Sequence, residues 1–128
     1  MDKRMRKQKG LAKECPPPVL EGPADAPLTF VAWGSTVGAV RDAMMLLHEK
    51  GKVTNLLRFP TLFPLDPAVV RSMFARTQKT LLVEGNYTGQ FGHLLRGETG
   101  IELPHTYLKY DGEPFYPRLI VERAEEVL

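Results

Sequence analysis

The chain of 128 residues is long enough for one domain with a buried core, and its 43% hydrophobic and 25% charged residues are typical of soluble globular proteins. It has neither the roughly 20 consecutive apolar residues of a membrane-spanning helix nor the apolar segment of a secretory signal. A single cysteine, Cys15, excludes an internal disulfide and any metal cluster held by several thiolates of this chain alone. We therefore expect a protein of the reducing cytoplasm, bound to neither membrane nor nucleic acid.

The formal net charge of +2 is concentrated at the start of the chain. Residues 1–14 hold six basic and two acidic groups, whereas residues 15–128 hold 11 basic and 13 acidic groups, a net charge of −2. Met1, Met5 and Ala12 would form a thin apolar stripe on a helix, so we interpret residues 1–14 as a basic connector helix or arm. A nucleic-acid or membrane arm and a transit peptide are the alternatives.

Residues 15–27 are predicted to form a proline-rich linker. Pro16–Pro18 is stiff and extended, because proline fixes φ and has no N–H to donate. Val19–Glu21 could form a short strand before the turn at residues 22–27. Flanking prolines would confine this strand to the edge of a sheet.

From residue 28 to residue 128, strands and helices are predicted to alternate in an α/β domain. Such alternation, with helices of about a dozen residues, is typical of a mostly parallel sheet covered by helices on both faces. Asp66 and Pro67 provide an N-cap and a first-turn proline for one helix, and Gly51 is a candidate for the residue that ends another. The predicted strands span residues 28–33, 53–59, 80–84 and 105–110, and the helices begin near residues 36, 67, 91 and 117.

The loop after the first long strand contains Ser35 and Thr36. It lacks both the G-x-G-x-x-G pattern of a dinucleotide fold and the Lys-Ser/Thr of a phosphate-binding loop. The two hydroxyl residues could cap the following helix, or the backbone amides there could hold an anion at the helix N-terminus.

The second long strand ends near Arg58, where a dinucleotide-binding fold would carry an acid for the ribose. Because ligands of parallel α/β sheets bind beyond the carboxyl ends of the strands, Arg58 is a candidate for contacting a carboxylate or a phosphate.

The third strand stops at Glu84 in the stretch LLVEGNYTGQF. Glu84 could act as a general acid or base if burial raised its pKa and a partner group stood nearby. Asn86 or Thr88 is suited to cap the next helix, and Tyr87 and Gln90 would be exposed beside them. By residue chemistry alone, this stretch is equally compatible with a structural turn and with a binding loop.

The three histidines, His48, His93 and His105, share no metal-ligand spacing, and no serine lies in a nucleophile elbow. We therefore predict no metal site and no complete catalytic centre in this chain.

Several motifs, taken together and in order, resemble the C-terminal region of the α subunit of 2-oxoacid:ferredoxin oxidoreductases, the pyruvate and 2-oxoglutarate enzymes. The resemblance covers essentially the whole chain, and its most specific parts are E-x-N-Y-T-G-Q at 84–90 and K-Y-D-G-x-P-F at 109–115. The other motifs are K-R-M-R-K at 3–7, W-G-S-T-x-G at 33–38 and R-F-P-T-L-F-P at 58–64.

The resemblance implies a transketolase C-terminal-like domain. Such a domain is a three-layer α/β/α structure with a five-stranded, mostly parallel sheet in the order 1-3-2-4-5. Its short first strand is antiparallel to the rest, which matches the proline-bound Val19–Glu21.

The resemblance also implies a function. The related enzymes decarboxylate a 2-oxoacid on thiamine diphosphate, pass electrons through iron–sulfur clusters to ferredoxin and transfer the acyl group to coenzyme A. We expect those cofactors in the preceding part of the α subunit and in partner subunits, with none bound by this chain. The chain would then be a fragment or a split subunit that is not catalytic alone, and the basic arm would be the connector to the missing part.

Within such a complex, the domain would serve subunit assembly and could help to bind an anionic substrate or coenzyme A. The residues proposed for ligand or interface contacts are Ser35, Thr36, Arg58, Glu84, Asn86, Tyr87, Thr88 and Gln90. The alternatives are a stand-alone module that binds an organic anion without an enzyme partner and, as a third possibility, autonomous catalysis by Glu84.

Overall fold

The computed structural model describes residues 17–60, 66–85, 90–109 and 115–128. The predicted arm, residues 1–14, lies outside the described residues. The elements in chain order are β1 (Val19–Glu21), β2 (Leu28–Trp33), α2 (Thr36–Glu49), β3 (Thr54–Phe59), α3 (Pro67–Phe74), β4 (Lys79–Glu84), α4 (Gln90–Thr99), β5 (Thr106–Leu108) and α5 (Pro117–Val127).

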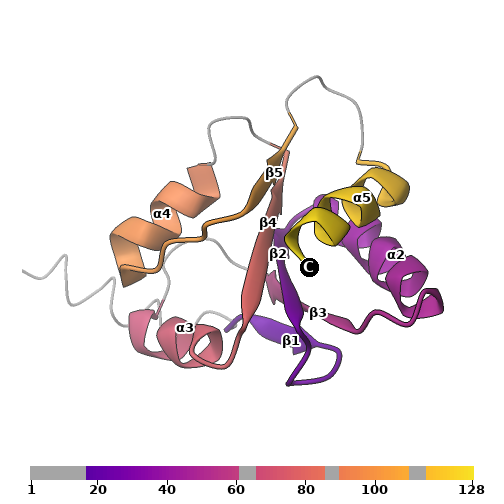
Figure 1. Cartoon of the computed structure of the whole chain (residues 1–128). Coiled ribbons are helices and arrows are strands. Elements are labelled where there is room, and N and C mark those ends of the chain that lie inside the picture. Colours follow the sequence, from indigo (N-terminus) through magenta and orange to yellow (C-terminus); the bar gives the residue numbers. More distant parts are fainter. Residues whose placement is uncertain (1–16, 61–65, 86–89, 110–114) are drawn as a thin grey trace, which may run out of the picture.

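The five strands form one sheet in the order β1-β3-β2-β4-β5, with β1 antiparallel to β3 and the other neighbours parallel. This order and the edge position of Val19–Glu21 confirm the predicted fold class. Helices α2 and α5 cover one face of the sheet and α3 and α4 cover the other (Figure 1). The chain therefore has the expected three layers.

The central strands are buried on both faces, which explains their unbroken apolar runs. Phe30 and Leu81 face α2 and α5, whereas Val31 and Leu82 face α3 and α4, as the alternation of side chains along a strand requires. Each of these side chains is fully buried. Burial of one such side chain stabilises the fold by about 1.5–3 kcal/mol.

The helix boundaries follow the predicted signals closely. Asp66 is the N-cap of α3, where its carboxylate accepts a hydrogen bond from the Ala68 N–H over 3.2 Å, and Pro67 begins the helix. Gly51 follows α2 with a φ of 77°, a left-handed conformation that favours glycine. Helix α3 ends at Phe74 and is short, so it covers only part of its sheet face.

None of the helices within the described residues is long and apolar enough to cross a membrane.

Two glycines inside α4 provide a matched test of how closely this helix packs on the sheet. A Cβ atom at Gly97 would meet no atom within 4 Å, whereas one at Gly92 would lie 3.2 Å from Leu82 Cδ2. We predict that Gly97→Ala raises the free energy of unfolding by about 0.5–1 kcal/mol, because alanine costs less backbone entropy in a helix. Gly92→Ala should gain less or destabilise the fold, as measured by urea unfolding. Equal stabilisation by both substitutions would contradict this packing.

Candidate functional site

Glu84 is a buried carboxylate at the end of β4, and it lies against the start of α4. Only 1% of the residue is exposed. It shares the sheet face of Leu82, which packs against α3 and α4. Its Oε1 accepts a hydrogen bond from the backbone N–H of Phe91, the second residue of α4, over 2.8 Å. The carboxylate thus acts as an N-cap supplied by a neighbouring strand.

Trp33 ends β2 on the same face as Glu84. Val31 and Leu82 are paired in the parallel register, and Trp33 and Glu84 each follow two residues later. Two buried polar atoms here, Trp33 Nε1 and Glu84 Oε2, have no hydrogen bond of good geometry to any described residue. The indole N–H nevertheless stabilises the carboxylate electrostatically and lowers its pKa. The last residues of β2 and β4 therefore place the indole N–H of Trp33, a donor, beside the carboxylate of Glu84, an acceptor.

Burial raises the pKa of Glu84 above its ordinary value of 4.5, because the charged form loses its hydration. The backbone N–H groups of Phe91 and Gly92, the Trp33 indole and the charge of His93 all oppose this shift. A buried carboxyl group with a raised pKa is the kind of group used for acid–base chemistry. The hydrogen bond between Glu84 and the Phe91 N–H also holds α4 on the sheet, which requires no role in chemistry.

Arg58 lies in a second cluster, on the opposite face of the sheet. It shares the face of Leu56, which packs against α2 and α5. Its Nε donates to Glu21 Oε2 over 2.8 Å, and Arg41 on α2 donates to both oxygens of the same carboxylate over 2.9 and 2.7 Å. The two guanidinium groups hold the pKa of Glu21 at about 2, with Arg41 contributing most. This cluster ties β1 to β3 and α2 and carries one excess positive charge.

Ser35 and Thr36 mark the start of α2, as predicted. Ser35 is the N-cap residue, but its side chain makes no capping hydrogen bond. The Thr36 hydroxyl instead donates to the Trp33 carbonyl over 2.8 Å. The cap expected from Ser35 is therefore not formed, and the hydroxyl of Thr36 fixes the turn after β2.

The predicted site residues thus fall into two groups rather than one. Ser35, Thr36 and Arg58 lie on the side of α2, whereas Glu84 and the exposed Gln90 lie on the side of α4. The strand ends share one edge of the sheet, but their side chains point to opposite faces. Three further predicted residues, Asn86, Tyr87 and Thr88, lie outside the described residues.

Sequence reasoning missed the partners of the two strongest candidates. The pairing of Trp33 with Glu84 could have been predicted, because both are the last residues of adjacent strands. Each also lies two residues after an apolar residue, Val31 or Leu82, on the face of α3 and α4. Glu21 and Arg41 had no such local signal, since Glu21 lies 20 residues from Arg41 and 37 residues from Arg58 along the chain.

Within residues 17–60, 66–85, 90–109 and 115–128, no three His, Cys, Asp or Glu side chains come close enough together to hold a metal ion.

Comparisons with known proteins place these features in a family. The transketolase C-terminal domain family matches residues 23–96. The 2-oxoacid:ferredoxin oxidoreductase subunit α of Saccharolobus solfataricus is 33% identical over 130 residues, which are 99% of this chain and 21% of that protein. The chain spans about a fifth of the curated relatives it matches.

Solved structures agree with this assignment. A 2-oxoglutarate:ferredoxin oxidoreductase from Magnetococcus marinus, with 2-oxoglutarate, coenzyme A and succinyl-CoA bound, superimposes with a TM-score of 0.85 at 33% identity; the match covers 96% of this chain and 22% of that one. The α chain of a probable 2-oxoacid ferredoxin oxidoreductase from Thermoplasma acidophilum matches with a TM-score of 0.62 at 32% identity, over 87% of this chain and 96% of that one.

We predict that Glu84 couples the stability of the fold to pH. Because its pKa is raised in the folded state, the unfolded chain loses this proton first as the pH rises above about 4.5. The free energy of unfolding of the wild type should therefore fall, relative to Glu84→Gln, from pH 4.5 up to the folded-state pKa and then level off. Urea unfolding at a series of pH values measures the difference.

Trp33 offers an independent readout of the same titration, because it is the only tryptophan in the chain. Its fluorescence in the folded wild type should change with the ionisation of Glu84, and this change should be absent in Glu84→Gln. Glu84→Ala should cost about 1–3 kcal/mol, because the Phe91 N–H would lose its buried acceptor. Parallel stability curves for wild type and Glu84→Gln would contradict the assignment.

Proposed function

Because this chain belongs to the transketolase C-terminal domain family and to the α subunits of 2-oxoacid:ferredoxin oxidoreductases, we propose that it is a non-catalytic assembly domain of such an enzyme. The complete enzyme would oxidatively decarboxylate a 2-oxoacid to an acyl-CoA and reduce ferredoxin. We place this complex in the cytoplasm.

The main observation behind the proposal is that Glu84 has a structural role, because it holds the start of α4 on the sheet. Its carboxylate caps α4 over 2.8 Å and is 1% exposed, so it is poorly placed to exchange a proton with a substrate. Glu21 is likewise occupied by two arginines. Both carboxylates therefore support the fold among the described residues, and the chemistry is assigned to other parts of the complex.

Under this proposal, thiamine diphosphate, iron–sulfur clusters and coenzyme A are held by the rest of the α subunit and by partner subunits. The match to about a fifth of the relatives supports this division, since four fifths of their length remains for those sites. The single cysteine also agrees with it, because a cluster needs several thiolates.

An assembly domain needs surfaces that other polypeptide can cover. Met45 is 66% exposed on α2, and Val53 is 42% exposed just before β3. They line a shared surface groove together with Met44. Methionine adapts well to a packing partner, so this groove is a suitable contact for the rest of the enzyme.

We predict that the affinity-tagged chain, purified from its own cells, carries the other subunits with it. The purified chain alone should show no 2-oxoacid-dependent reduction of ferredoxin, whereas the recovered complex should. Mass spectrometry and the activity assay measure the two outcomes. Recovery of the chain without any such subunit would contradict the assembly role and favour a stand-alone anion-binding module.

Arg58 supports a second role, the binding of an anion by the assembled enzyme. Glu21 orients its guanidinium group through Nε, and the two terminal nitrogens have no partner among the described residues. The side chain is 31% exposed. Such a fork suits a carboxylate or phosphate group of a 2-oxoacid or of coenzyme A.

The variants Arg58→Ala and Glu21→Gln distinguish a role of Arg58 in anion binding from a role in the fold alone. Both substitutions weaken the tie to β1, but only the first removes the candidate anion-binding cation. We predict that, in the complete enzyme, Arg58→Ala raises the KM for the 2-oxoacid or for coenzyme A by about tenfold, the worth of one charge-assisted contact. Glu21→Gln keeps an oxygen that can accept from Arg58 Nε, so it should raise the same KM by clearly less. Equal effects of the two variants would show that Arg58 acts only on the fold.

A further inference from the structure

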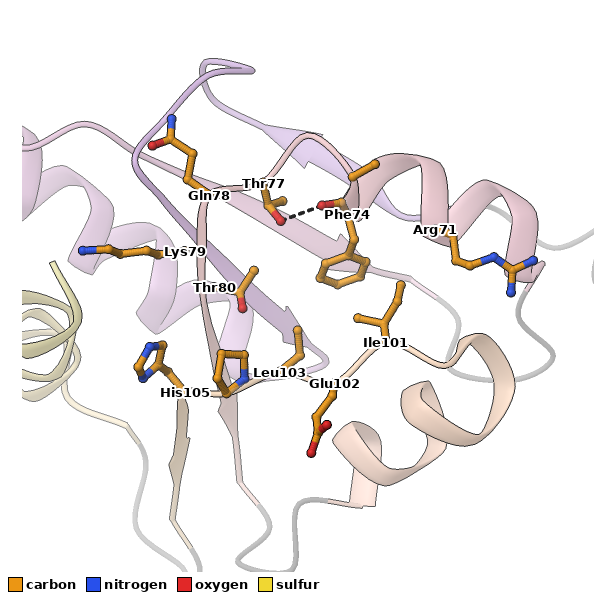
Figure 2. A pocket seen from close by; sticks show the side chains of 12 residues that line it. Arg71, Phe74, Thr77, Gln78, Lys79, Thr80, Ile101, Glu102, Leu103 and His105 are labelled. Carbon is orange, nitrogen blue, oxygen red and sulfur yellow. Dashed lines mark hydrogen bonds between the residues drawn. The ribbon is translucent and has the colours of Figure 1, made fainter.

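A cleft of about 500 Å³ lies at the amino ends of β4 and β5, at the edge of the sheet opposite to the strand ends described above. It is bounded by the end of α3, the residues that lead into β4 and the segment 101–105 that leads into β5 (Figure 2). Because α3 ends at Phe74, this part of the sheet face has no helix over it. The volume is in the range of small-molecule sites.

A row of polar side chains crosses the sheet and reaches the cleft at Thr80. Asn55, Thr29 and Thr80 are side by side on β3, β2 and β4, and the side-chain alternation puts all three on the face of α3. They are only 2%, 1% and 7% exposed. Polar side chains this deeply buried normally have hydrogen-bond partners.

Most of this row lacks such partners. The Asn55 amide donates to the Pro23 carbonyl over 2.7 Å, but Asn55 Oδ1 and the Thr29 hydroxyl have no partner among the described residues. The Thr80 hydroxyl likewise makes no hydrogen bond within the described part of the chain, and Thr80 lines the cleft. Thr80 therefore presents an available hydrogen-bonding group at the base of the cleft.

Five of the twelve residues that line the cleft are apolar, and three of its charged side chains make contacts elsewhere. Phe74, Ile101 and Leu103 lie on one side of Thr80 and His105 lies on the other, whereas the tips of Arg71 and Lys79 lie at opposite ends (Figure 2). Arg71 donates to the Thr99 carbonyl, and Lys79 donates to the carbonyls of Val127 and Leu128.

Glu102, the acid at the rim, lies 3.7 Å from Arg96, measured between Oε1 and Nη1. The three charged side chains of the lining, Arg71, Lys79 and Glu102, thus make contacts of their own, and His105 is the further ionisable residue there. An anion would gain a pairing with Arg71 or Lys79 only if those contacts broke.

We propose that this cleft binds a small uncharged molecule with an apolar, preferably aromatic, body and one hydrogen-bonding group. The body lies against Phe74, Ile101 and Leu103, and the polar group pairs with the Thr80 hydroxyl. This site is separate from Arg58 and Glu84 and does not depend on the proposed function of the chain.

Benzyl alcohol and benzoate form a matched pair of probes, because they share the ring and differ in charge. In an amide-resolved NMR titration of the full chain, benzyl alcohol should shift the signals of residues 77–80 and 101–105 saturably. Benzoate should bind at least about tenfold more weakly, since Arg71 and Lys79 already donate to backbone carbonyls. This comparison uses the wild-type chain and needs no folding control.

Variants test the hydrogen bond. Thr80→Val should weaken benzyl alcohol binding by about tenfold, Thr80→Ser should retain it, and Thr106→Val, on β5 outside the cleft lining, should leave it unchanged. The proposal is overturned if benzyl alcohol causes no saturable shift at millimolar concentration, if benzoate binds as well, or if Thr80→Val binds as tightly as the wild type.

Discussion

Burial of β2 and β4 on both faces is the constraint on which the rest of the structure depends. Phe30, Val31, Leu81 and Leu82 are fully buried, and consecutive residues point to opposite sides, so each face needs its own cover of helices. The pairs α2–α5 and α3–α4 provide those covers (Figure 1). The same alternation continues to the strand ends and distributes the polar residues there between the two faces.

This distribution explains why one edge of the sheet carries two unrelated clusters. The Glu84 side chain points to the same face as Leu82 and contacts the start of α4. The backbone N–H groups there offset part of the cost of burying its charge. The Arg58 side chain points to the same face as Leu56 and contacts Glu21, which also accepts hydrogen bonds from Arg41. A ligand bound at one cluster would be separated from the other by the sheet itself. Any role in anion binding therefore belongs to the α2 side, and the role of Glu84 is best understood through α4.

The residues at the amino ends of the strands form a different kind of site. Asn55, Thr29 and Thr80 form a buried polar row there, on the face of the sheet that carries the short helix α3. The cleft lies beside Thr80. The two edges of the sheet thus differ: Glu84 and Arg58 lie near the carboxyl ends in two separate clusters, and a cleft with the Thr80 hydroxyl, unpaired among the residues described, lies at the amino ends.

The sequence by itself determined the alternation of strands and helices, because apolar runs and helical spacing are local properties. It also determined the α3 N-cap at Asp66 and the turn at Gly51, which depend on neighbouring residues alone. The strand order and the edge strand were reached through the family resemblance and were confirmed. Only the tertiary structure decided which polar groups meet. Sheet register brings Glu21 to Arg58 across 37 residues of chain and Glu84 to Trp33 on the neighbouring strand. Phe91 lies only seven residues after Glu84, but the packing of α4 against the sheet sets the contact of its N–H with the carboxylate.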